Sequence, residues 1–92
     1  MRVVLDARAV GDLGEILDWI AQDSPRTADR VVGRILDSVE RLGRFPEMGR
    51  NGRDPGTREW VVPGLPYIAV YELRPEMDEL VVIAVFHGAK DR

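Results

Sequence analysis

Residues 10–43, VGDLGEILDWIAQDSPRTADRVVGRILDSVERLG, decide the fold, because they contain two amphipathic helical patterns separated by a very short break. In the first pattern, apolar side chains recur every three or four residues and so share one helical face: Val10, Leu13, Ile16, Leu17 and Ile20. Acidic side chains occupy the opposite face: Asp12, Glu15 and Asp18. The second pattern has an apolar stripe of the same kind: Ala28, Val31, Val32, Ile35, Val39 and Leu42.

The break between the two patterns predicts that the first helix ends there and that a second helix begins. The hydroxyl of Ser24 can accept hydrogen bonds from the free amides at a helix start, and Pro25 suits the first helical position. Two helices joined by so tight a turn are expected to form an antiparallel hairpin.

Strands are predicted on both sides of the hairpin. Residues 2–5 form a short first strand, and Asp6 can then cap the first helix. Gly43 ends the second helix and is followed by a Gly/Pro-containing loop over residues 44–57. Three further strands are predicted by their β-branched and aromatic content, over residues 58–62, 67–73 and 80–86, the last covered on both faces. The sequence therefore predicts one α+β domain over residues 1–92, a helical hairpin packed on a small antiparallel sheet in the order β-α-α-β-β-β.

Composition excludes several classes of protein. There are no cysteines, so disulfides and thiolate metal sites are absent, and one histidine does not supply a zinc site. We expect no cofactor. The N-terminus does not resemble a signal peptide, and no apolar run approaches the roughly 20 residues of a membrane span, so a soluble, cytoplasmic protein is expected.

Charge is unevenly distributed along the chain. The net charge is −3, which argues against direct sequence-specific binding of nucleic acid. Residues 41–58, however, contain five arginines against Glu47 and Asp54, a local charge of +3: Arg41, Arg44, Arg50, Arg53 and Arg58. Twelve of the thirteen cations are arginine, which reflects either genome composition or a surface for carboxylates or phosphates.

One enzymatic activity is compatible with these residues, namely metal-independent cleavage of RNA. His87, the lone histidine, could act as acid or base, with Arg50 and Arg58 as cations and Tyr67 or Tyr71 as a stacking platform. Each residue also has a structural interpretation. His87 can satisfy backbone groups at a strand end, the tyrosines can pack at the core edge, and Arg58 can pair with a glutamate on a neighbouring strand.

Four segments together resemble the RelE/ParE superfamily of toxins from type II toxin–antitoxin systems. They are GDLGEILDWIAQDSP, ADRVVGRILDSVERLGRFPEMGR, GTREWVVPGLPYIAVYEL and VVIAVFHGAKDR, which follow in the same order over essentially the whole chain. The resemblance implies a compact toxin with a cognate antitoxin encoded in the same operon, which wraps and neutralises it.

Details of the resemblance favour the ParE-like branch. The RelE and YoeB branches cleave ribosome-bound mRNA with a cluster of cations, an acid or base and a near-terminal aromatic residue. Here Ile68 replaces a preferred cation, and Gly88 and Ala89 stand where that pattern offers His or Tyr. The ending is similar to the V-x-H-x-x-R ending of ParE-like toxins, with Lys90 in the arginine position. ParE-like members lack the RNase groups and are associated with poisoning of DNA gyrase.

The resemblance also implies two binding surfaces. Carried over by position, the target-binding residues are Arg50, Arg58, Tyr67, His87 and Lys90. The antitoxin is expected on the helical hairpin, including Trp19, which lies off the first apolar stripe and otherwise packs at the hairpin edge. The alternatives are a RelE-like, ribosome-dependent endonuclease using Arg58 and His87, and a binding module that has lost toxicity.

Overall fold

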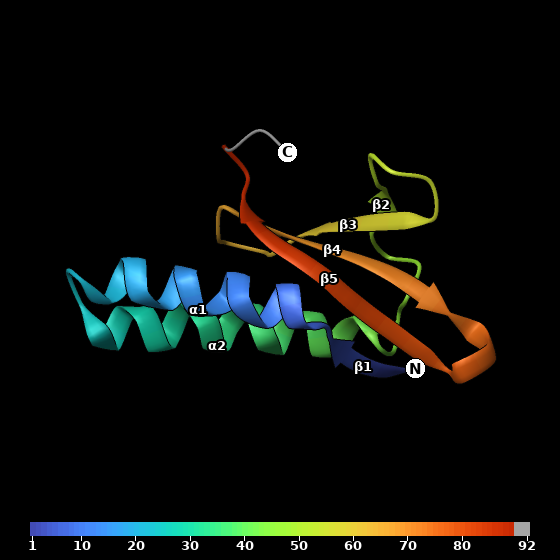
Figure 1. The fold of residues 1–92 in the computed structure, drawn as a ribbon, viewed down its shortest axis with the longest axis horizontal. Helices are drawn as coiled ribbons and strands as arrows, with labels where there is room; N and C mark the ends of the chain where they lie inside the picture. Colours follow the sequence, from blue (N-terminus) through green and yellow to red (C-terminus); the bar gives the residue numbers. More distant parts are fainter. Residues whose placement is uncertain (90–92) are drawn as a thin grey trace.

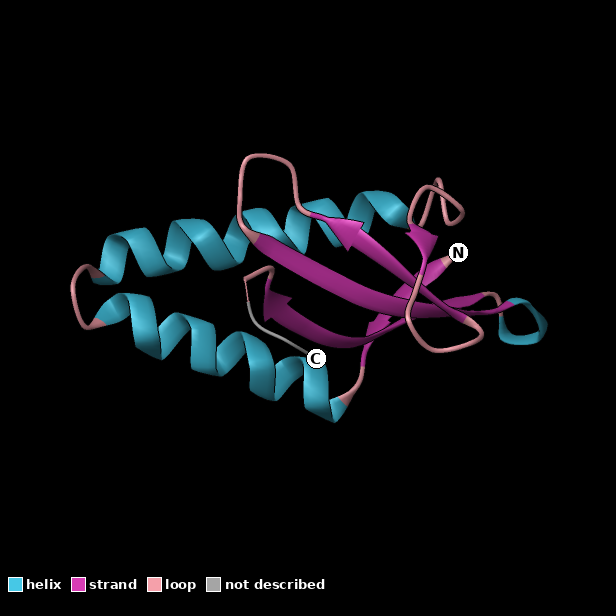
Figure 2. Cartoon of the chain, turned by 90° about the horizontal axis from the view of Figure 1, so that it is seen from above, coloured by secondary structure: helices cyan, strands magenta, loops and turns pink. Residues whose placement is uncertain are grey.

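The helical hairpin covers one face of a five-stranded sheet in the computed structural model, which describes residues 1–89 (Figure 1). The helices are α1 (Ala7–Ala21) and α2 (Pro25–Leu42). The strands are β1 (Arg2–Leu5), β2 (Arg50–Asn51), β3 (Thr57–Val61), β4 (Tyr67–Arg74) and β5 (Glu79–His87), with a 3-10 turn at Pro75–Met77. Seen from above, the strands lie over the space between the two helices (Figure 2).

Local capping signals set where the helices begin. The Asp6 carboxylate accepts a hydrogen bond of 2.9 Å from the backbone N–H of Ala9, and the Ser24 hydroxyl accepts one of 3.2 Å from Thr27. The predicted starts of both helices are therefore confirmed, with Pro25 as the first residue of α2.

Gly43 ends α2, as predicted, but for a reason the sequence does not reveal. Its backbone stays right-handed, with φ of −58°. A Cβ atom at this position would lie 2.6 Å from the carbonyl oxygen of Met1, while the N-terminal ammonium of Met1 donates a 2.7 Å hydrogen bond to the Gly43 carbonyl. The glycine thus allows the start of the chain to lie against the end of α2.

The sheet has the strand order β1-β5-β4-β3-β2. The expected antiparallel pairing holds from β2 to β5, but β1 pairs parallel to β5, so the sheet is mixed. Parallel strands require a long crossover connection, and here the whole chain from α1 to the 3-10 turn lies between β1 and β5. The segment expected to be a loop contains the two-residue strand β2. This strand pairs only with Arg58 and Glu59 of β3.

The core lies between the helices and the sheet. Its largest fully buried side chains are Tyr71, Ile35, Leu42, Leu80, Val62, Val70 and Val82. Consecutive residues Leu80, Val81 and Val82 are all buried, which agrees with the prediction of a strand covered on both faces. Among residues 1–89, no helix is long and apolar enough to cross a lipid bilayer.

Candidate functional site

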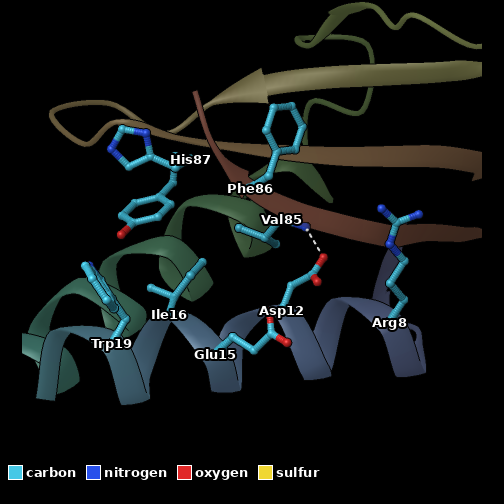
Figure 3. Close-up of a pocket in the computed structure, with 9 residues that line it drawn as sticks. Arg8, Asp12, Glu15, Ile16, Trp19, Val85, Phe86 and His87 are labelled. Carbon is cyan, nitrogen blue, oxygen red and sulfur yellow. Dashed lines mark hydrogen bonds between the residues drawn. The ribbon is translucent and has the colours of Figure 1, made fainter. Parts of the chain in front are cut away.

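An open pocket lies between α1 and the last part of β5. Strand β1 pairs with β5 only as far as Val82, so the edge of β5 beyond that residue faces α1 instead of another described strand. The pocket has a volume of about 400 Å³. It is lined by residues from α1, β4 and β5: Arg8, Asp12, Glu15, Ile16, Trp19, Tyr67, Val85, Phe86 and His87 (Figure 3).

Asp12 joins the two walls of this pocket. Its carboxylate accepts a hydrogen bond of 2.9 Å from the backbone N–H of Val85 on β5 (Figure 3). The carboxylate thus occupies the position of a neighbouring strand's carbonyl group at an edge where β1 has already ended. In the sequence, Asp12 belongs to the polar face of the first helix, and no local signal connects it to Val85, so this role is not predictable from the pattern.

His87 makes two contacts at the mouth of the pocket. Its ring meets the ring of Tyr67 edge to face, with centroids 5.5 Å apart and planes at 81°. Its Nδ1 atom accepts a hydrogen bond of 3.1 Å from the backbone N–H of Ala89. Both contacts stabilise the end of the strand, as the structural interpretation of His87 predicts. Tyr67, in turn, is buried in the core.

Arg50 and Arg58 lie elsewhere on the sheet. The Arg58 guanidinium donates hydrogen bonds of 3.2 Å and 2.9 Å to the backbone carbonyls of Glu47 and Gly49. Arg50 forms an ion pair of 3.3 Å with Glu59. Both side chains therefore hold the loop that follows α2 against β3.

The register of the sheet separates the arginines from the histidine. Arg58 lies opposite Tyr71 and His87 opposite Tyr67. These tyrosines are four residues apart on β4, which corresponds to roughly 13 Å along a strand. The structure therefore brings Tyr67 and His87 together but not Arg58. Lys90, also predicted to bind the target, lies outside the described residues.

The pocket does contain a cation, Arg8, but it is distant from the imidazole. Arg8 and His87 lie at opposite ends of the pocket (Figure 3). Along α1, Arg8 precedes Ile16 by about two helical turns, or roughly 12 Å. A single phosphodiester group would not reach both side chains. In the described part of the chain, no group of three or more acidic or histidine side chains is arranged to hold a metal ion.

Comparison with known families gives a match over nearly the whole chain. A family model described as "ParE toxin of type II toxin-antitoxin system, parDE" matches residues 3–92. "Putative toxin Y4kP" of Sinorhizobium fredii is 39% identical over 82 residues, which are 89% of this chain and 85% of the relative. Toxin RelE2 of Caulobacter vibrioides is 34% identical over 90 residues, which are 97% of each chain.

Solved structures share the fold at lower sequence identity. A chain of the chromosomal ParDE toxin–antitoxin system from P. aeruginosa has a TM-score of 0.84 at 22% identity, with 95% of each chain covered. The isolated E. coli RelE toxin has a TM-score of 0.69 at 16% identity, covering 99% of this chain and 87% of that one. Both therefore have the same arrangement of helices and strands.

Proposed function

This chain belongs to the ParE family of toxins from type II toxin–antitoxin systems, within the RelE/ParE superfamily, and on that premise we propose that it arrests growth by binding DNA gyrase. A cognate antitoxin from the same operon neutralises it. The separation of the His87 imidazole from the guanidinium groups is the observation that carries this proposal over RNA cleavage.

Cleavage of RNA would require these groups to converge. A proton-transfer group and a cation must act on the same phosphodiester, because the cation stabilises the charge that develops as the proton moves. Here Arg58 is bonded to backbone carbonyls, and Arg50 is paired with Glu59. A toxin without such a constellation acts by occupying a surface of its target.

We place the antitoxin in the pocket between α1 and β5. The Trp19 side chain is 71% exposed and lines this pocket together with apolar groups of Ile16 and Val85. An exposed tryptophan beside an apolar recess suits an extended partner segment that inserts apolar anchors of its own. Trp19 is therefore proposed to lose most of its exposed surface in the complex.

The residues proposed to contact gyrase differ in role. Arg50 and His87 reach the surface, whereas Tyr67 is buried behind His87 and Arg58 is held against the loop. Arg50 and His87 are therefore proposed to touch the target directly, and Tyr67 and Arg58 to hold these contacts in place; Lys90, assigned to the same surface by the resemblance, lies outside the described residues.

Supercoiling by purified gyrase tests the proposal. Folded toxin at micromolar concentration should inhibit supercoiling, and an equimolar amount of the cognate antitoxin should restore it. Unchanged supercoiling in the presence of folded toxin would refute gyrase as the target.

A second candidate is a ribosome-dependent mRNA endonuclease. It is supported by the likeness to a relative named toxin RelE2 and by the His87–Tyr67 pair at the mouth of a pocket. Toeprinting of translating ribosomes separates the two candidates, since an endonuclease would leave codon-linked cuts that disappear in His87→Ala.

A further inference from the structure

The loop between α2 and β2 exposes two large apolar side chains. Phe45 is 60% exposed and Met48 is 59% exposed, on either side of Pro46. Single exposed apolar residues are common on protein surfaces and require no explanation. Here, however, the backbone that carries both residues is fixed from beneath by side chains of the sheet.

Tyr71 provides the first two attachments. This residue is fully buried on β4, and its hydroxyl donates a 2.8 Å hydrogen bond to the Pro46 carbonyl. The same hydroxyl accepts a 2.9 Å hydrogen bond from the backbone N–H of Gly49. A Cβ atom at Gly49 would lie only 2.6 Å from this hydroxyl, so a side chain at that position would displace the loop.

Arg58 provides two more attachments, to the carbonyls of Glu47 and Gly49. Within the loop, the backbone N–H of Met48 also donates a 3.0 Å hydrogen bond to the Phe45 carbonyl. We call residues 44–50 the pinned loop. Because its backbone is already fixed, a partner that binds Phe45 and Met48 does not have to order the chain first, which lowers the cost of binding.

Positive charge predominates near the apolar pair. Arg41 at the end of α2, Arg44 in the loop and Arg50 on β2 are exposed, against one exposed carboxylate, Glu47, which lies beside Met48. Arg50 is paired with Glu59, so Arg41 and Arg44 supply most of the excess positive charge. Aromatic residues, methionine and arginine are the side chains enriched in protein interfaces. An apolar centre with an excess of positive charge nearby complements an apolar recess bordered by carboxylates.

Nucleic acid fits this surface less well. A phosphate backbone offers no apolar group for Phe45 and Met48, and the net charge of −3 opposes its approach. We propose that the pinned loop is a docking surface for an acidic, partly apolar surface of the toxin's protein target. This inference rests on the proposed function only in requiring that the target be a protein.

The pinned loop lies at the opposite end of the helical hairpin from Trp19, the proposed anchor for the antitoxin. It follows the C-terminus of α2, whereas Trp19 lies near the turn that joins α1 to the N-terminus of α2 (Figure 1). The 18 residues of α2 correspond to a helix roughly 27 Å long. Substitutions in the loop should therefore weaken binding to the target without weakening binding to the antitoxin.

The test compares the double variant Phe45→Ser/Met48→Ser with the matched control Met77→Ser. Met77 is 57% exposed on the turn between β4 and β5, so the control removes a similar exposed apolar side chain from another surface. Growth arrest is measured on induction without antitoxin, and affinities for gyrase and for the cognate antitoxin are measured with purified full-length chains.

We expect the double variant to lose growth arrest and to keep its affinity for the antitoxin within about twofold of the original. The control variant should arrest growth like the original protein. Binding to gyrase should weaken by roughly 30-fold or more, as for truncation of interface hot spots. If the original protein arrests growth but does not bind gyrase, and the double variant does not arrest growth, the docking surface is supported and the choice of gyrase is wrong.

Three outcomes would overturn the docking surface. The first is a double variant that arrests growth as well as the original protein. The second is a double variant that loses antitoxin affinity as well, since that result assigns Phe45 and Met48 a structural role. The third is loop-dependent binding of duplex DNA alone, measured by fluorescence anisotropy, with an affinity equal to that for the protein target.

Discussion

The carboxylate of Asp12 on α1 and the backbone N–H of Val85 on β5 are joined by a hydrogen bond of 2.9 Å, although 73 residues separate them in sequence. This contact holds the first helix against the stretch of β5 that β1 does not cover. It also joins the two walls of the pocket in which we place the antitoxin (Figure 3).

Removal of this acceptor should destabilise the fold. In Asp12→Ala the partly buried N–H of Val85 loses its partner, which should lower the free energy of unfolding by about 1–2 kcal/mol. Asp12→Asn keeps a side-chain oxygen that can accept the same hydrogen bond, so it should remain closer to the original protein. Urea unfolding measures both variants. Equal destabilisation by alanine and asparagine would mean that the charge of Asp12, and not the hydrogen bond, is what matters.

Tyr71→Phe should also destabilise the protein, by loosening the pinned loop. The substitution removes the acceptor of the Gly49 N–H and the donor to the Pro46 carbonyl, at a cost of about 1–2 kcal/mol. Tyr67→Phe is the matched control on the same strand and should change the free energy of unfolding by less than about 0.5 kcal/mol. Chemical denaturation compares the two. A Tyr71→Phe protein as stable as the control would show that the loop does not depend on this hydroxyl.

Stability should fall in alkaline solution through the same tyrosine. Burial raises the pKa of Tyr71 above its ordinary value of 10.0, and this effect outweighs the opposing influence of the Gly49 hydrogen bond and Arg58. Because the folded state holds the proton more tightly than the unfolded state, the stabilisation is complete below about pH 10 and is lost as the pH rises through the folded-state pKa.

The difference in stability between the original protein and Tyr71→Phe should therefore shrink as the pH rises above about 10. Denaturant midpoints measured for both proteins at each pH provide the check. A difference that stays constant or grows with pH would contradict a raised pKa.

What could be predicted from the sequence depended on how far apart the interacting residues are. Asp6 and Ser24 cap their helices through contacts three residues away, so the pattern alone predicted both helix starts. The partner of β1 lies 77 residues further along the chain, where Arg2 pairs with Glu79, and no local pattern specifies that this pairing is parallel.

The candidate site was harder to predict than the fold for the same reason. Sequence position left open whether Arg58 binds a target or pairs with a glutamate on a neighbouring strand, and in the structure its guanidinium binds the carbonyls of a loop that folds back over β3. Conversely, the Tyr67–His87 contact depends on the register between β4 and β5, which a bulge between Val70 and Tyr71 shifts.

Trp19→Ala should weaken the antitoxin complex without weakening the fold. Truncation of an aromatic anchor typically costs about 2 kcal/mol of binding free energy, or roughly a 30-fold loss of affinity. Since Trp19 is 71% exposed, its truncation should change the free energy of unfolding by less than about 0.5 kcal/mol. Val10→Ala, on the same helix and 55% exposed but outside the pocket, is the control for calorimetric titration with antitoxin. Equal affinities for both variants would move the antitoxin to another surface.

His87→Ala should leave growth arrest largely intact. A contact residue at the edge of a binding surface is worth tenfold or less in affinity, whereas a general acid or base contributes about 10²–10⁴-fold to rate. The variant also loses the edge-to-face contact with Tyr67, so its free energy of unfolding should fall by about 0.5–1.5 kcal/mol, and toxicity must be compared at equal amounts of folded protein. Titration of inducer against growth rate measures the effect. A hundredfold loss of potency together with the disappearance of mRNA cuts would identify the imidazole as catalytic and replace gyrase binding with RNA cleavage.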